Sequence, residues 1–153
     1  MKTISAAAAL CLLLAACTAP AKTASHGLLP QPIGWKAVLI AGDDKEPAFD
    51  NAVDAMAGRL AEFGVPPSNI TILKATRSGR QAATQANVVD AFAGLDTAST
   101  DGCFVFVTSH GGPGRGLFMK RDDGFLDPGE LDHLLSGACA GRPTVVIASG
   151  CFS

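Results

Sequence analysis

Apolar residues in this chain gather in short runs that are separated by polar, Gly- or Pro-containing turns. Four runs have the length and composition of strands: Trp35–Ala41, Ile70–Leu73, Cys103–Val107 and Pro143–Ala148. The third run, CFVFV, is apolar on both faces, as a central strand of a parallel sheet is. We expect the fourth run, PTVVIA, to be buried in the same way.

Between these runs the apolar spacing changes to that of helices. Three helices are predicted: Pro47–Phe63, ended by Gly64; a helix capped by Thr84 and running to about Leu95; and a helix from Asp127-Pro128 to about Leu135. The segments 117–120 and 124–126 predict a small hairpin. This alternation is typical of an α/β fold, a three-layer α/β/α sandwich with a mostly parallel sheet. In such sheets the chemistry gathers at the carboxyl ends of the strands.

The first residues read as a targeting signal rather than as part of the fold. Lys2 precedes an uncharged apolar run, Ile4–Ala16, which is too short to span a membrane. Leu14-Ala15-Ala16-Cys17 matches a lipobox, where a signal peptidase cuts before a lipidated cysteine; an ordinary secretory signal that happens to contain Cys17 is the alternative. We therefore predict a lipoprotein signal peptide at 1–16, a lipidated tether at 17–33 and a folded domain at 34–153.

The expected location is the bacterial cell envelope. Thr18, after the lipidated cysteine, is not the Asp that commonly retains lipoproteins at the inner membrane, so anchoring to the periplasmic side of the outer membrane is favoured. The formal net charge of −2, without a basic stripe, argues against a nucleic-acid partner.

Three cysteines belong to the folded domain, since Cys11 leaves with the signal and Cys17 is lipidated. An exported protein with three thiols can pair two and leave one free. We favour a Cys103–Cys139 disulfide that leaves Cys151 reactive; two buried thiols are the alternative.

His110 and Cys151 are the residues on which a function depends. Each follows the carboxyl end of a long apolar strand, so neighbouring strands would bring the imidazole and the thiol to one edge, about 5 Å apart. Taken singly, each residue also has a purely structural interpretation. His110 can be a polar residue that ends a strand, and Cys151 can be a small buried apolar residue. Together they suggest a base beside a nucleophile.

Other chemistry is less well supported. The Gly-rich segment 111–116 contains Pro113 and leads into a hairpin, which does not suit a phosphate-binding helix start. The chain has no Gly-x-Ser-x-Gly elbow. Three histidines make a zinc site improbable, and the acidic residues do not have the spacing of an EF-hand: Asp122, Asp123, Asp127 and Glu130. We predict no metal and no cofactor.

Three segments resemble the caspase-like, legumain-type cysteine peptidases. Phe104–Gly111 (FVFVTSHG) is similar to the strand that ends in the catalytic His-Gly, and Val145–Ser153 (VVIASGCFS) to the strand that ends in the catalytic Cys. Trp35–Asp54 is similar to the first strand, its turn and the start of the first helix. The resemblance implies a caspase-like fold, a His110–Cys151 dyad, and an oxyanion site at the backbone N–H groups of Gly111 and Cys151.

The chain also departs from that family. Asp44 stands where the family has an Asn that supports the catalytic His, so Asp44 is the candidate for that role. The specificity-pocket positions fall on Asp50 and Ser149 instead of Arg and Glu. A preference for Asn at the cleaved bond is therefore not implied, and a pocket lined by Asp50 would suit a basic residue. The family continues past the nucleophile with a helix and further strands, so these residues are expected to be the N-terminal portion of such a domain.

Two functions follow from the resemblance. The first is a lipid-anchored cysteine endopeptidase or transpeptidase that acts on a peptide or protein through an acyl-enzyme. The second is a catalytically silent lipoprotein that uses the same cleft to bind a peptide or partner, which the changes at Asp44, Asp50 and Ser149 favour.

Overall fold

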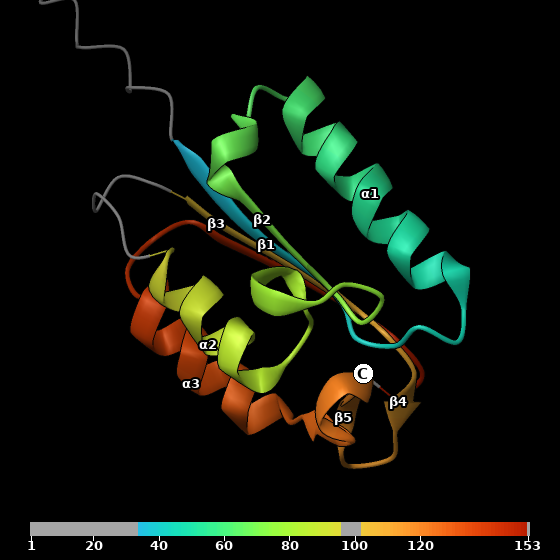
Figure 1. The fold of residues 1–153 in the computed structure, drawn as a ribbon. Coiled ribbons are helices and arrows are strands. Elements are labelled where there is room, and N and C mark those ends of the chain that lie inside the picture. The colour runs from blue at the N-terminus through green and yellow to red at the C-terminus, as the bar shows by residue number, and fades with distance from the viewer. Residues whose placement is uncertain (1–33, 96–101, 153) are drawn as a thin grey trace, which may run out of the picture. The chain divides into compact units, whose positions relative to one another are not determined.

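The computed structural model describes residues 34–95 and 102–152, which form an α/β arrangement (Figure 1). Its main sheet has four parallel strands in the order β2-β1-β3-β7: β1 (Trp35–Ala41), β2 (Ile70–Lys74), β3 (Gly102–Thr108) and β7 (Thr144–Ser149). The predicted signal peptide (1–16) and the predicted tether (17–33), which includes Cys17, lie outside the described residues.

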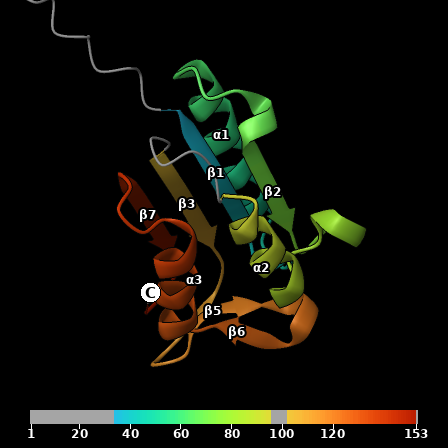
Figure 2. The ribbon, with the colours of Figure 1, turned by 90° about the vertical axis from the view of Figure 1, so that its left-hand side faces the viewer.

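Helices cover both faces of this sheet (Figure 2). Helix α1 (Pro47–Glu62) packs on one face through Val53 and Leu60. Helices α2 (Gln85–Ala93) and α3 (Pro128–Ala138) pack on the other, against a second apolar cluster. Alternate side chains of β1 and β3 serve the two clusters, because successive strand residues point to opposite faces.

The helix ends follow the local chemistry of the sequence. The Thr84 hydroxyl accepts the Asn87 N–H at 3.2 Å, and the Asp127 carboxylate accepts the Gly129 N–H at 2.8 Å, so side chains cap both α2 and α3. Helix α1 instead begins with Pro47 and ends before Gly64, whose φ of 90° is left-handed. All three predicted helices are confirmed, with α3 extending three residues further than expected.

A second, three-stranded antiparallel sheet lies at the carboxyl ends of the main strands. It contains β4 (Gly111–Gly112), β5 (Gly116–Met119) and β6 (Gly124–Leu126), and the predicted hairpin is its β5–β6 pair. Short 3-10 turns at Pro67–Asn69, Gly79–Gln81 and Lys120–Asp122 complete the described elements. The Lys120 N–H donates to the Gly42 carbonyl at 2.8 Å, so this sheet is fastened to the end of β1.

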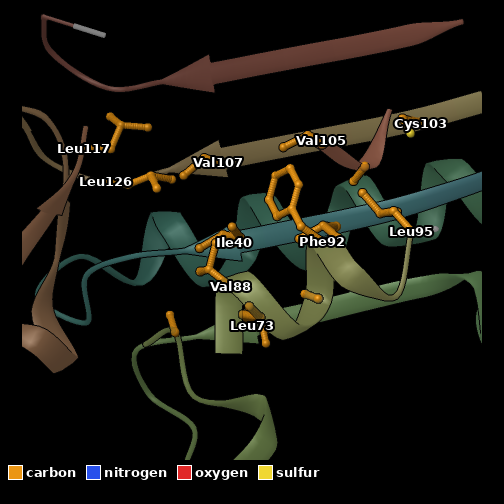
Figure 3. Packing of buried hydrophobic residues seen from close by; sticks show 14 of the residues in the cluster. Ile40, Leu73, Val88, Phe92, Leu95, Cys103, Val105, Val107, Leu117 and Leu126 are labelled. Carbon is orange, nitrogen blue, oxygen red and sulfur yellow. The ribbon is translucent and has the colours of Figure 1, made fainter. Parts of the chain in front are cut away.

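The core of the α2 and α3 face centres on Phe92, which is almost completely buried. Figure 3 shows its ring among aliphatic side chains of β1 and β3, including Ile40 and Val105. Leu117 and Leu126 of the small sheet belong to the same cluster. The small sheet is therefore packed into the main core rather than attached only by its loop.

Cys103 and Cys139 form a disulfide across 36 residues of sequence. The sequence leaves open a disulfide or two buried thiols, and the structure has the disulfide. It joins the first residues of β3 to the end of α3, where Cys139 is the C-cap. Among the described residues, Cys151 is the free cysteine.

The expectation that the fourth apolar run is buried is wrong. All six residues of β7 are exposed, and Val145, Val146 and Ile147 are 38%, 41% and 37% accessible. The reason is that β7 is an edge strand and that no described helix covers it fully; β2, at the other edge, is partly buried. On the α1 side, Val145 borders an apolar hollow that is also lined by Trp35 and Phe63.

Candidate active site

Three neighbouring strands of the sheet, β1, β3 and β7, end level with one another. Ala41 of β1 pairs with Thr108 of β3, and Thr108 pairs with Ser149 of β7. Two residues beyond these partners lie Asp43, His110 and Cys151, which we name the strand-end row. The order of side chains along this row is carboxylate, imidazole, thiol.

The ladder between β3 and β7 continues into the turn before His110. The Ser109 N–H donates to the Ser149 carbonyl at 3.1 Å, one residue before His110. Because neighbouring strands lie about 4.8 Å apart, the chains that carry His110 and Cys151 leave the sheet side by side. The sequence-based expectation that their strands are neighbours is confirmed.

His110 is exposed and is held through its backbone and its ring. Its carbonyl accepts the Phe118 N–H of β5 at 2.7 Å. Its imidazole meets the Phe49 ring of α1 edge-on, with centroids 5.1 Å apart and planes at 88°. The imidazole is therefore directed toward the α1 side of the sheet.

Cys151 is exposed, and glycine makes its approach to β4 possible. A Cβ on Gly111 would overlap the Cys151 carbonyl oxygen, and a Cβ on Gly150 would lie 2.7 Å from the Ser109 carbonyl oxygen. Only residues without a side chain allow the chain after β7 to lie this close to the chain after β3. The Gly that follows His110 is thus in direct contact with the backbone of Cys151.

Within the described residues, the side chains of His110 and Cys151 are not hydrogen-bonded to each other. Catalytic hydrogen bonds are often long in the absence of substrate. The arrangement brings a base and a free nucleophile to one edge without pairing them.

Asp44 has a different partner from the one expected. Its carboxylate lies 3.6 Å from the Lys120 Nζ, with both side chains 40% exposed. The residue before it, Asp43, is 1% exposed. The carboxylate in line with His110 therefore belongs to Asp43, which sequence reasoning missed; counting residues from the last pair of β1 would have found it.

The two candidate pocket residues are not neighbours in the structure. Asp50, in the first turn of α1, accepts the Thr76 hydroxyl at 2.6 Å and lies 3.9 Å from the Lys74 Nζ, while its Oδ1 is buried without a hydrogen-bond partner. Lys74 also pairs with Asp54 at 2.8 Å. Ser149 ends β7 on the other side of β3.

The described residues hold no cluster of three His, Cys, Asp or Glu side chains that could bind a metal ion. The acidic residues near the hairpin have structural roles instead: Asp122 accepts the Gln85 N–H at the start of α2, and Glu130 accepts the Gln85 side-chain amide. No helix in this part of the chain is long and apolar enough to cross a bilayer.

A scan against protein-family models finds no match to this chain, and a search of curated proteins finds no significant similarity. The legumain-type resemblance therefore stays a prediction that rests on the three segments that carry it.

Proposed function

We propose that this chain carries a thiol-dependent acyl-transfer site on a caspase-like, legumain-type domain, with Cys151 as nucleophile and His110 as base. The reaction is peptide-bond cleavage, or transfer of the acyl group to another amine. The observation that supports it most is the level ending of β3 and β7, which brings an exposed imidazole and a free thiol to one edge.

The chemistry needs both residues. A thiol is mostly protonated at neutral pH, so His110 takes the Cys151 proton as the sulfur attacks the carbonyl carbon. A carbon–sulfur bond forms, the carbon–nitrogen bond breaks, and the imidazolium returns the proton to the leaving amine. Water or a second amine then releases the acyl group from the thioester.

Backbone N–H groups of Gly111 and Cys151 are the proposed oxyanion donors. Their closeness supports this, because Gly111 contacts the Cys151 backbone. Loss of one such donor typically costs about 3 kcal/mol of transition-state stabilisation. A side chain at this place would overlap the Cys151 carbonyl, so glycine is what allows the two N–H groups to lie close together.

The proposed location is the bacterial cell envelope, with a lipid on Cys17 as the anchor to the periplasmic side of the outer membrane. The Cys103–Cys139 disulfide supports export, because disulfides persist mainly outside the reducing cytoplasm. The substrate is then a peptide or protein that reaches the membrane surface.

Alkylation with iodoacetamide tests the dyad. At pH 6.5 an ordinary thiol is only about 1% thiolate, so an activated Cys151 should react at least about tenfold faster in the native chain than in urea. His110→Ala should remove that advantage. His133→Ala is the matched control, since His133 is an exposed residue of α3. Equal rates in native and unfolded wild-type chain would refute the proposal.

A second candidate is a peptide-binding lipoprotein without catalysis. The observation that favours it is the absence of a hydrogen bond between the His110 and Cys151 side chains in the described residues. Cleavage of a peptide library by the wild-type protein, and its loss in Cys151→Ala, separates the two functions. A library that is bound by both proteins and cut by neither supports binding alone.

A further inference from the structure

The strand-end row contains a carboxylate that the proposed dyad does not yet use. We infer that Asp43 is a positioning residue for His110: its carboxylate accepts a hydrogen bond from the imidazole, orients the ring and stabilises its protonated form. This inference rests on the proposed function for its purpose, but the contact between Asp43 and His110 can be tested without catalysis.

The first argument is register. Ala41 and Thr108 are Cα partners, and the Gly42 N–H donates to the Thr108 carbonyl at 3.0 Å, so the parallel ladder extends past the end of β1. The next residue along is Asp43, and the chain bends only from Asp44 onward. Neighbouring strands lie about 4.8 Å apart, which is within reach of a carboxylate–imidazole hydrogen bond.

The second argument is side-chain direction. Ala41 belongs to the apolar cluster on the α1 face, and strand alternation gives Asp43 the same side two residues later. The His110 ring also lies on that side, because it contacts Phe49 of α1. Both side chains therefore leave the sheet toward α1.

The third argument is the charge of a buried group. Asp43 is 1% exposed, and the Lys45 N–H donates to its Oδ1 at 3.1 Å. A buried carboxylate without a cation is costly, and no ion pair joins Asp43 to another described residue. An imidazole at the neighbouring strand end can supply the positive charge.

The other charged groups at this end of the sheet have partners of their own. Asp44 pairs with Lys120 on the side of the small sheet, and Asp50 lies beside Lys74 on the side of β2. Lys45 and Glu46 are exposed residues of the turn, and Cys151 lies on the far side of His110 from Asp43. Asp43 is thus, among the described residues, the buried carboxylate without an ion pair whose position in the register matches that of His110.

The chemical consequence is a defined role in acyl transfer. A carboxylate behind the imidazole fixes which ring nitrogen carries the proton and leaves the other nitrogen facing the thiol. It also stabilises the imidazolium that forms when Cys151 loses its proton. Asp43 does not touch the substrate and does not exchange a proton with it.

The test is a long-range ¹H–¹⁵N NMR spectrum of the His110 ring at pH 8.5 in the Cys151→Ala chain, which shows which ring nitrogen carries the proton. The His110 signals are assigned by their loss in His110→Ala. Asp43→Asn should shift the ring toward the other tautomer, because an amide nitrogen, which donates, then replaces a carboxylate oxygen, which accepts. The tautomer of His133 should stay unchanged as the internal reference.

Asp43→Asn preserves an oxygen that can accept the Lys45 N–H, so thermal unfolding should change little. Asp43→Ser, with a hydroxyl acceptor, is the second variant if the first does not fold. Asp44→Asn removes the same charge one residue later. An equal change of the His110 tautomer in that variant would refute a specific role for Asp43, as would an unchanged tautomer in both Asp43 variants.

The two proposals fail in different ways. If Cys151 alkylation in the otherwise wild-type chain does not depend on His110, the dyad is wrong whatever Asp43 does. If alkylation depends on His110 but the His110 tautomer does not depend on Asp43, the dyad stands and the positioning role is wrong.

Discussion

Removal of the Cys103–Cys139 disulfide should lower the free energy of unfolding by about 4 kcal/mol. The bridge closes a loop of 36 residues, and the loop-closure entropy for that length corresponds to about 3.8 kcal/mol at 25 °C. Both cysteines are buried, at 1% and 4% exposure, so a small packing loss adds to this figure. The perturbation is the double variant Cys103→Ala with Cys139→Ala.

Urea denaturation followed by the fluorescence of Trp35, the one tryptophan of the chain, measures the loss. Cys151→Ala is the matched control, because that thiol is exposed, and its effect should stay within about 0.5 kcal/mol. A loss below about 1 kcal/mol in the double variant would refute the loop-closure reasoning. A non-reducing peptide map of the wild-type chain in which Cys103 and Cys139 are both alkylated would also refute it, because the disulfide would then be absent.

Two further substitutions test the site and the core. Gly111→Ala places a Cβ on the Cys151 carbonyl oxygen, so the backbone of Cys151 has to move. If contact with Gly111 sets the reactive position of the thiol, alkylation of Cys151 by iodoacetamide at pH 6.5 should slow at least about tenfold. An unchanged alkylation rate contradicts this. Phe92→Ala empties the centre of the larger core cluster and should cost about 3–5 kcal/mol of unfolding free energy in urea, whereas the exposed Phe63→Ala should cost under about 1 kcal/mol.

The secondary structure could be predicted from the sequence because each element has a strong local cause. Trp35–Ala41 is an uninterrupted apolar run, and the structure has a strand with those same bounds. Thr84 and Asp127 cap the helices that they were expected to cap. In these places the local preference and the tertiary packing agree.

The burial of β7 could not be predicted in this way. Composition shows what a strand tolerates on each face, whereas exposure depends on which elements lie over it. The sequence TVVIAS suits a strand covered on both sides, yet all six residues are exposed because the strand lies at an edge of the sheet and no described helix covers it fully.

The choice between Asp43 and Asp44 also depends on information that the sequence does not contain. The family resemblance assigned the support of His110 to Asp44, because a resemblance compares positions along the sequence. The structure compares positions across strands, and there Asp43 is in line with His110 while Asp44 turns toward Lys120. A shift of one residue reverses the direction of a strand side chain, so the two assignments place different chemistry at the site.

The three residues of the strand-end row differ in how firmly the surrounding structure packs their strands. Asp43 and His110 follow inner strands whose side chains are packed under helices on both faces, and His110 is further fixed by Phe118 and Phe49. Cys151 follows β7, whose residues are exposed throughout. Local opening costs least where few buried contacts resist it, so we expect β7 to open more readily than β1 and β3. A ligand or segment that covers β7 should therefore change the alkylation rate of Cys151 without contacting His110, and an unchanged rate would contradict this expectation.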